Sequence, residues 1–377
     1  MNDIVYYETI PSYKEFLERH LVSNQPAMFG PALTKDWKAR KEWVIPNEQA
    51  MPRFKPNYAY LESRFGNTRV QVAECNKRHF TDQERSEMTF AEFCQLWEAN
   101  EGKKEKSGNY YLKDWHFVKA FPDEGAYEVP KVFKDDWLNE YWINHSEDDY
   151  RFSYMGGDGT FTPLHADVYR SYSWSSNICG IKKWTLFPPG QEDCFKDKLG
   201  NMVYDIRQVD PVQFPRFKDA KSIVIYQRDG ESLFVPSGWF HQVENIGATI
   251  SINHNWCNST NILFTFNSLQ SDYKEVKESI QDIRESVTSD EFMQECQKLL
   301  LMHSGWNWSL FLSILHHVAT CYIKNCDYQP DVQWQMIKIE KVLNDWQEDK
   351  DLVGFLKQDP SLYQKFNELQ TVIKHRE

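Results

Sequence analysis

Eight short apolar or alternating runs between residues 151 and 255 constrain the fold of this chain more than any other feature. Gly, Pro or Asp separates each run from the next, as is typical of strands joined by turns. The runs are 151–155, 161–167, 172–179, 182–188, 222–226, 231–235, 239–244 and 249–255. Eight such strands predict a closed double-sheet barrel of the jelly-roll type. The gap at 189–221, rich in Asp, Lys and Pro, is predicted to be an insertion between the fourth and fifth strands.

The regions on either side of this barrel have a different pattern. Ser12-x-x-Glu15 and Thr89-x-x-Glu92 match helix capping boxes and predict helices near 13–20 and 90–99. After the barrel, helical periodicity predicts further helices near 291–302, 308–323, 331–346 and 361–374. We therefore predict an α+β protein with a mainly β core. Its parts are an N-terminal α/β supporting region at 1–150, the barrel at 151–258 and a C-terminal helical region at 259–377.

An apolar stripe marks the first C-terminal helix. Its members alternate spacings of four and three along one helix face: Ile262, Phe266, Leu269, Tyr273, Val276, Ile280 and Ile283. The stripe spans only about three heptads, which is the lower limit for a coiled coil. We therefore expect it to pack inside the chain or to form a helical-bundle homodimer, and both alternatives stay open.

Composition excludes several classes of protein. Of the 377 residues 41% are hydrophobic and 15% aromatic, which is too apolar for a disordered chain. The net charge of −12 argues against a nucleic-acid surface and is compatible with a basic partner or with solubility alone. No window approaches the roughly 20 apolar residues of a membrane span, and no basic, then apolar, leader is visible. Eight cysteines without a C-x-x-C pair indicate reduced thiols, so we expect a cytoplasmic protein.

Two histidines and one aspartate form a candidate metal site. His165 and Asp167 stand two apart in a predicted strand, where alternate side chains face the same side. His241 follows a Pro-Ser-Gly turn and lies in another short run, from which a neighbouring strand could deliver a third ligand. Two imidazoles and one carboxylate leave other positions of an ion open. This pattern is typical of non-haem Fe(II) that activates oxygen and not of a closed structural zinc site.

A buried lysine and a polar strand face accompany these ligands. Strand alternation puts Lys182 and Trp184 on one face and Lys183 on the other, so one lysine is predicted to be buried. A buried ammonium is costly without an anion, and the carboxylate of a 2-oxo acid would be a suitable partner. The last strand predicts a site lined by hydroxyls and amides, because one of its faces carries Thr249, Ser251, Asn253 and Asn255.

Three segments resemble the JmjC-domain 2-oxoglutarate oxygenases. They are 154–167 (YMGGDGTFTPLHAD), 180–189 (GIKKWTLFPP) and 234–243 (FVPSGWFHQV). Within that family the resemblance is greatest to the jumonji-domain-containing protein 4 group. It implies a double-stranded β-helix, the cupin-like form of the jelly roll, in which Fe(II) is held by His165, Asp167 and His241.

The resemblance also implies a cosubstrate site. Lys182 matches the family lysine that pairs with the far carboxylate of 2-oxoglutarate, and Asn253 matches a polar residue of the final strand. Thr162 matches a hydroxyl three residues before the first ligand, although strand parity requires a bulge to bring it to the same face. Some members carry an asparagine ten residues after the first histidine. This chain has Ser175 there and Asn177 two residues further on, so Asn177 is a candidate for that contact.

The activity that the resemblance implies is hydroxylation of a protein side chain with Fe(II), 2-oxoglutarate and O2. For the group named above, the implied target is a lysyl residue of a translation termination factor, with no nucleic-acid or membrane partner. N-methyl-lysine demethylation uses the same ligands and stays open, since the two reactions differ in which carbon is oxidised. A barrel that binds a metal or another ligand without turnover is the non-enzymatic alternative.

Overall fold

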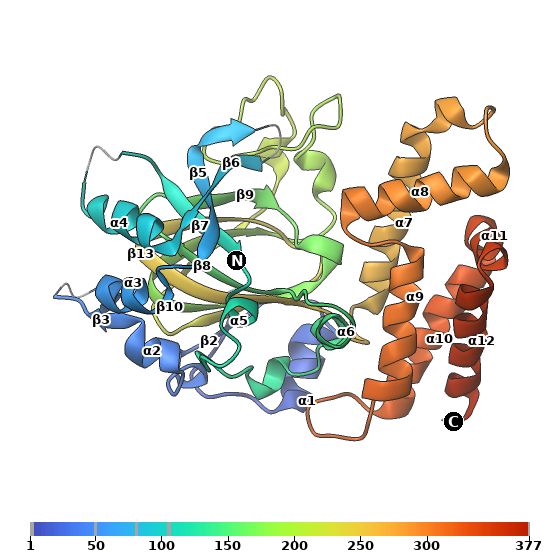
Figure 1. Ribbon diagram of the computed structural model, residues 1–377, viewed down its shortest axis with the longest axis horizontal. Helices are drawn as coiled ribbons and strands as arrows, with labels where there is room; N and C mark the ends of the chain where they lie inside the picture. The colour runs from blue at the N-terminus through green and yellow to red at the C-terminus, as the bar shows by residue number, and fades with distance from the viewer. Residues whose placement is uncertain (1–3, 49–50, 80–81, 104–106, 376–377) are drawn as a thin grey trace.

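A mixed sheet of eleven strands is the centre of the computed structural model, which describes residues 4–48, 51–79, 82–103 and 107–375 (Figure 1). β10 (Tyr172–Phe187) and β13 (Phe240–Trp256) lie side by side in the middle of this sheet and pair along their whole length. The strands that pair with these two inside the barrel are β8 (Arg151–Gly156), β9 (Phe161–His165), β11 (Ile223–Gln227) and β12 (Ser232–Val235).

Each of the two long strands has different neighbours along its two halves. The first half of β10 pairs with β12 and the second half with β11. The first half of β13 pairs with β9 and the second half with β8. Two four-stranded sheets result, in the orders β8-β13-β10-β12 and β9-β13-β10-β11. This arrangement, in an α+β protein with helices at both ends of the chain, confirms the predicted jelly-roll core.

The predicted breaks at 180–181 and 245–248 are wrong, because the runs on either side belong to one continuous strand in each case. Gly180 and Gly247 do have left-handed backbones, with φ of +79° and +75°. In β10 this conformation accompanies a shift of register against β13 between Asn177 and Ile181. The glycine therefore forms a bulge inside a strand, where the sequence suggested a turn between two strands.

Alanine at Gly180 is expected to destabilise the protein by about 2–5 kcal/mol, combining the left-handed backbone cost with that of overpacking. A Cβ there would lie 2.4 Å from the carbonyl oxygen of Ala248. Gly190 is the matched control, since its φ is +88° but a Cβ would meet nothing within 4 Å. Gly190→Ala should therefore lose only about 1–2 kcal/mol. Urea unfolding of both variants checks this, and equal losses would contradict the close approach at Gly180.

The N-terminal residues extend the same sheet at both edges, so the proposed division near residue 150 falls inside a sheet. From β8 the sheet continues through β7 (Tyr110–Trp115), β5 (Arg69–His79) and β6 (Asp82–Thr89), and from β12 through β2 (Ala27–Phe29) and β1 (Val5–Tyr7). β3 (Val44–Pro46) and β4 (Phe54–Pro56) form a separate pair.

Short helices cover this N-terminal half: α1 (Tyr13–Phe16), α2 (Lys38–Glu42), α3 (Tyr58–Phe65), α4 (Phe90–Ala99), α5 (Phe117–Ala120) and α6 (Trp137–His145). The helix predicted at 90–99 is confirmed, together with the reciprocal capping box between Thr89 and Glu92. The helix predicted near 13–20 is α-helical only to Phe16. It then continues as a π-helix over Leu17–Leu21, so the sequence signal marked its start but not its form.

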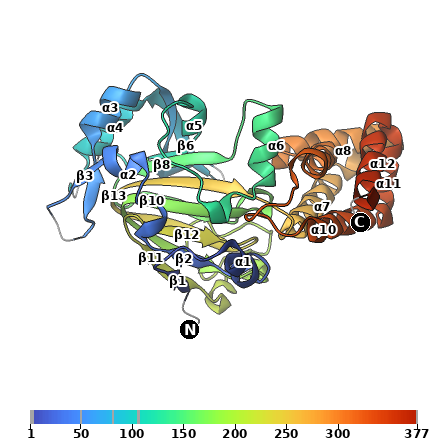
Figure 2. The same cartoon turned by 90° about the horizontal axis from the view of Figure 1, so that it is seen from below.

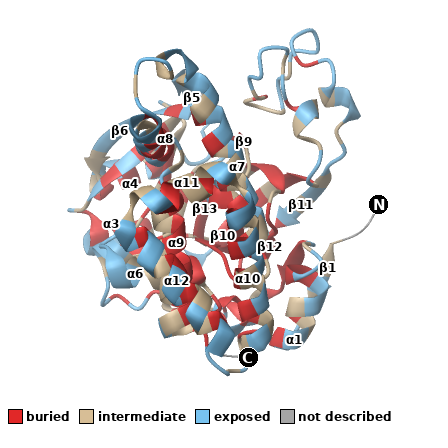
Figure 3. Ribbon diagram, turned by 90° about the vertical axis from the view of Figure 1, so that its right-hand side faces the viewer, coloured by how far each residue is buried: buried red, intermediate tan, exposed pale blue. Residues whose placement is uncertain are grey.

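The C-terminal helices form a bundle beside the barrel (Figures 1 and 2). They are α7 (Ile262–Ser279), α8 (Ser289–Ser304), α9 (Trp308–His317), α10 (Val332–Glu348), α11 (Lys350–Gln358) and α12 (Pro360–His375). The stripe residues from Ile262 to Val276 are buried within the chain, whereas Ile280 and Ile283 lie beyond the end of α7. The stripe therefore packs inside the molecule, and Figure 3 shows the buried inner faces of these helices.

The insertion at 189–221 lies between β10 and β11 as predicted, and it has its own small core. Phe195, Val203 and Phe214 pack there with Phe187 and Phe240, the residues at the end of β10 and the start of β13. In the described part of the chain no helix is both long and apolar enough to cross a membrane. All eight cysteines are free thiols, as the sequence predicted.

Candidate metal centre

His165 and His241 face each other across neighbouring strands. His165 ends β9 and is the direct partner of His241 in β13, and their ring centroids lie 4.3 Å apart. Asp167 completes the group, and one ligand atom from each of the three residues lies within 4.8 Å of the others. The structure thus brings the three predicted ligands together at one end of the barrel.

Asp167 reaches this position by a different route from the one predicted. β9 ends at His165, and Asp167 precedes a short 3-10 turn over Val168–Arg170. The two ligands therefore do not share a strand face by simple alternation. The chain leaves the strand after His165, and the turn returns the carboxylate toward the two imidazoles.

Backbone carbonyls orient both imidazoles. His165 Nδ1 donates to the carbonyl of Pro163 at 2.8 Å, and His241 Nδ1 donates to the carbonyl of Trp239 at 3.0 Å. Each Nδ1 therefore carries the proton, and each Nε2 keeps a lone pair. Burial, and then the neighbouring His241, lowers the pKa of His165 below its usual range, which favours the neutral ring that a metal requires.

Two side chains hold the carboxylate of Asp167. Asn255 Nδ2 donates to Oδ1 at 2.9 Å, and Ser173 Oγ donates to Oδ2 at 2.7 Å. Ser173 and Asn255 are direct partners in the pairing of β10 with β13, so the sheet register places both donors on the same carboxylate. The sequence had indicated the polar face that contains Asn255, whose amides and hydroxyls could orient the metal ligands, but it gave Ser173 no role.

The donor set fits a redox-active divalent metal. Mononuclear Fe(II) sites use two neutral imidazoles and one carboxylate as ligands. In such sites the ligands are themselves hydrogen-bonded, as the imidazoles and the carboxylate are here. Such a site keeps coordination positions open for other molecules. His165, Asp167 and His241 are thus the residues that would hold the ion.

Lys182 is buried beside this centre, as predicted. Its ammonium donates to the hydroxyl of Tyr111 at 3.2 Å and lies 5.9 Å from the ring centroid of Tyr154. No carboxylate pairs with it in the described part of the chain, and burial lowers its pKa to about 7. Lys183, on the opposite face, pairs with Glu244 at 3.0 Å. A buried ammonium without an anion, next to open metal positions, is suited to an anionic ligand.

Thr162 and Asn253 line the same cavity as the three ligands and Lys182. Thr162 can do so because β9 has a bulge between Thr162 and His165, where two residues, Pro163 and Leu164, face the single residue Gln242 of β13. Pro163 lies in this bulge and has no amide hydrogen to donate to β13. The bulge that strand parity required, if Thr162 is to face the same side as His165, is therefore present.

Asn177 does not reach this cavity. Its side chain is fully buried elsewhere and donates to the carbonyl of Gly180 at 2.7 Å, so it braces the bulge in β10. Ser175 lines the cavity in its place and donates to Oδ1 of Asn253 at 3.0 Å. The sequence had given Ser175 and Asn177 as the two polar residues of this strand that could face the site, and of these Ser175 lines the cavity.

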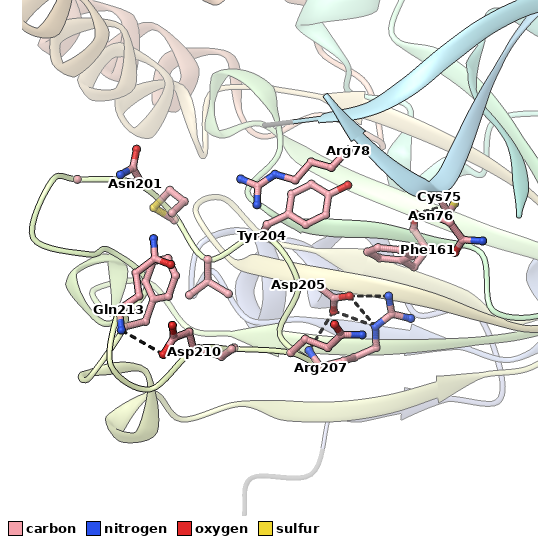
Figure 4. A pocket seen from close by; sticks show the side chains of 16 residues that line it. Cys75, Asn76, Arg78, Phe161, Asn201, Tyr204, Asp205, Arg207, Asp210 and Gln213 are labelled. Atoms are coloured by element: carbon pink, nitrogen blue, oxygen red, sulfur yellow. Dashed lines mark hydrogen bonds and ion pairs between the residues drawn. The ribbon is translucent and has the colours of Figure 1, made fainter. Parts of the chain in front are cut away.

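The insertion makes hydrogen bonds to both strands that carry the histidine ligands, β9 and β13. The carbonyl of Tyr204 accepts a hydrogen bond from the amide of Leu164, next to His165. Asp205 accepts from the side chain of Gln242, next to His241, and pairs with Arg207 (Figure 4). The insertion therefore contacts the neighbour of each histidine. Together with residues of β5 and with Phe161 of β9 it also lines the groove drawn in Figure 4.

Comparison with known proteins agrees with this geometry. Residues 13–262 match the family of cupin-like domains. The chain is 47% identical over 317 residues to the arginine-specific demethylase JMJ20 of Arabidopsis thaliana, covering 80% of this chain and 66% of that protein. It is 41% identical over 333 residues to the 2-oxoglutarate and iron-dependent oxygenase JMJD4 of Danio rerio, covering 87% and 77%. For JMJD4 of Homo sapiens the identity is 38% over 314 residues, covering 82% and 73%.

The chain spans about two thirds of the length of the Arabidopsis relative and somewhat more of the two JMJD4 proteins. The cupin-like match runs from residue 13 to residue 262, so it includes the barrel and the three residues of the candidate metal centre. The chain therefore belongs to the cupin-like JmjC family of 2-oxoglutarate- and iron-dependent oxygenases.

Proposed function

We propose that this oxygenase hydroxylates a lysyl side chain of a protein, and that the protein is a translation termination factor. The observation that carries the catalytic part is the buried Lys182 beside His165, Asp167 and His241. The target rests on the resemblance to the jumonji-domain-containing protein 4 group. A bifunctional arginine demethylase and lysyl-hydroxylase of Caenorhabditis briggsae, 26% identical over 248 residues, supports a basic side chain as the substrate. A translation factor would place the reaction in the cytoplasm.

Each part of the site has a task in this proposal. Bound iron would supply the oxidising chemistry, with 2-oxoglutarate and O2 as cosubstrates. Lys182 would neutralise the far carboxylate of the oxo acid, and Thr162 and Asn253 would hydrogen-bond it. The indole of Trp184 is buried, packs 5.5 Å from the His241 ring and is fixed by a hydrogen bond to Gln227. Its apolar surface would exclude water from that side of the centre.

The rim near the metal centre suits a basic side chain. Phe152 pairs with Asn253 across β8 and β13, so both side chains lie on the same sheet face. The Tyr150 ring lies 6.2 Å from the Phe152 ring. The half-exposed carboxylate of Asp148 lies 3.5 Å from Nδ1 of His116, whose ring packs 5.0 Å from that of Phe152. Aromatic faces and a carboxylate attract an ammonium or guanidinium group.

Mass analysis of a reacted factor tests the proposal. Iron-loaded protein is incubated with 2-oxoglutarate, with and without a purified translation termination factor, and succinate is measured. We expect the factor to stimulate succinate release and to gain one oxygen on lysine. Succinate release without any change in the factor would retain the oxygenase and reject this target.

Demethylation of arginine is the second candidate, because the relative with 47% identity is named an arginine-specific demethylase. N-methyl-lysine demethylation is distinguished by the same assay. Methylated arginine and methylated lysine peptides would lose a methylene and release formaldehyde, whereas a hydroxylated lysine peptide gains an oxygen. A barrel without turnover would release no succinate under any of these conditions, and a Mn(II) titration would show whether it still holds a metal.

Alanine at Asn255 is expected to weaken metal binding about 10–100-fold, the usual effect of removing an outer partner of a ligand. The change removes the hydrogen bond to Oδ1 of Asp167 and leaves the three ligands in place. Asn367, which is exposed in α12, provides the matched Asn→Ala control. Isothermal titration with Mn(II) measures both variants. Unchanged affinity in Asn255→Ala would show that Ser173 alone orients the carboxylate.

A further inference from the structure

The turn that follows Asp167 has an unfavourable backbone. Tyr169 and Arg170 have φ of 59° and 49°, in the left-handed region that residues with a Cβ avoid. This turn begins at Asp167, whose carbonyl accepts a hydrogen bond from the amide of Arg170 at 3.1 Å. Such a conformation persists only where the surroundings enforce it. Contacts that hold Tyr169 therefore also hold the backbone that presents the Asp167 carboxylate.

The C-terminal helices make those contacts. The ring of Tyr169 is buried and packs on Trp306, with 4.1 Å between centroids. Its hydroxyl donates to the carbonyl of Gly305 at 3.2 Å and shares a hydrogen bond with the hydroxyl of Tyr150. Gly305 and Trp306 join α8 to α9, and α7 also packs against the turn. The helical bundle thus contacts the strained turn that follows Asp167.

Gly305 shows how close this contact is. Its φ is +75°, and it caps the end of α8 with a hydrogen bond from its amide to the carbonyl of Leu301. A Cβ at this position would lie 3.1 Å from the hydroxyl oxygen of Tyr169. Glycine at this position therefore allows the left-handed backbone that ends α8, and it leaves room for the hydroxyl of Tyr169.

On the other side, Arg170 is held against β13. Its guanidinium lies 5.0 Å from the ring centroid of Phe240, the residue before His241. The two left-handed residues are therefore anchored to different parts of the molecule, Tyr169 to the helices and Arg170 to the strand that carries a histidine ligand. A shift of the α8–α9 junction would be transmitted to the relative positions of Asp167 and His241.

We propose that the α8–α9 junction of the C-terminal helices positions Asp167 through Tyr169. Tyr169 is a positioning residue, since it acts on the ligand through the backbone of the turn. The inference rests on the assignment of Asp167 as a ligand in the proposed function. It gives the helical region a role in metal binding in addition to packing against the barrel.

The test compares four variants of the full chain. Tyr169→Phe removes only the hydroxyl, and Gly305→Ala displaces it. The matched controls are Tyr363→Phe, at an exposed tyrosine of α12, and Gly102→Ala, at a glycine with φ of +69° and no atom within 4 Å of a Cβ. We expect both test variants to bind Mn(II) about tenfold more weakly, the lower end of outer-partner effects, and both controls to bind as the parent does.

Hydrogen exchange in the metal-free protein is the second readout. The amides of residues 168–171 should exchange faster in Tyr169→Phe and Gly305→Ala than in the controls, with the exchange of β10 and β13 unchanged. Parent-like Mn(II) affinity in both test variants would overturn the proposal, even if thermal stability falls, because Tyr169 would then serve packing alone. If the parent protein itself binds no Mn(II), the proposed function fails, while unchanged exchange at 168–171 would separately reject the contact argument.

Discussion

Asp167→Ala is expected to abolish metal binding and all succinate release. Asp167 is the sole carboxylate among the three ligands that the described structure brings together, so its loss removes the only negative charge of that group. Because loss of an outer partner alone costs about 10–100-fold in metal affinity, loss of the ligand should exceed 100-fold. Mn(II) titration followed by a succinate assay with Fe(II) measures the two effects in order.

Asp123, an exposed carboxylate in the loop after α5, provides the matched Asp→Ala control. It should retain parent affinity and parent turnover. The Asp167→Ala chain should stay folded, since Ser173 and Asn255 can hydrogen-bond to water once the carboxylate is gone. Turnover near the parent level in a folded Asp167→Ala protein would refute the metal site. Equal losses in both variants would point to a general defect of the preparation.

The fold class could be predicted because its signal is local. A strand with one buried face repeats every two residues, and some segments of the two four-stranded sheets show this repeat in the sequence. Others, such as β12, are short apolar runs that are buried at every position. The continuity of β10 through Gly180 and of β13 through Gly247 could not be predicted. A left-handed glycine suits a turn and a bulge equally well, and only pairing with the neighbouring strand decides between them.

The same division between local and distant information applies to the site. His165, Asp167 and His241 stand out because of their residue types and their context. Ser173 and Asn255 become partners of the carboxylate only through the register of β10 against β13, which joins positions 82 residues apart. Asn177 shares the alternation of Ser173 and Ser175, but the register shift that follows it turns its amide to Gly180.

The strained turn after Asp167 shows a further limit. Nothing in the sequence Val168-Tyr169-Arg170 predicts two successive left-handed residues, because neither tyrosine nor arginine favours that conformation. It arises from packing against Trp306, which lies more than a hundred residues later in the chain. Local propensity is overruled here by tertiary contact, and this occurs next to a predicted ligand, where strain is often tolerated for function.

Lys182→Ala is expected to raise the 2-oxoglutarate concentration needed for half-maximal turnover by roughly 100-fold, the effect of losing about 3 kcal/mol from a buried charge pair. Metal affinity should change little, because Lys182 contacts Tyr111 and Tyr154 and none of the three ligands. Lys183→Ala is the matched control. It removes the neighbouring lysine on the opposite face, which pairs with Glu244, and should leave the cosubstrate requirement unchanged.

The pKa of Lys182 gives this prediction a second, independent readout. Burial lowers that pKa to about 7, and a bound dianion would raise it again by stabilising the ammonium. Below pH 7 the lysine is already charged, so binding takes up no proton there. Above pH 7 binding must recharge it, so affinity should fall as the pH rises and about one proton should be taken up near pH 8.5. Calorimetry in buffers of different ionisation enthalpy measures this uptake, which should vanish in Lys182→Ala and persist in Lys183→Ala. Equal proton uptake in the two variants would remove Lys182 from the cosubstrate site.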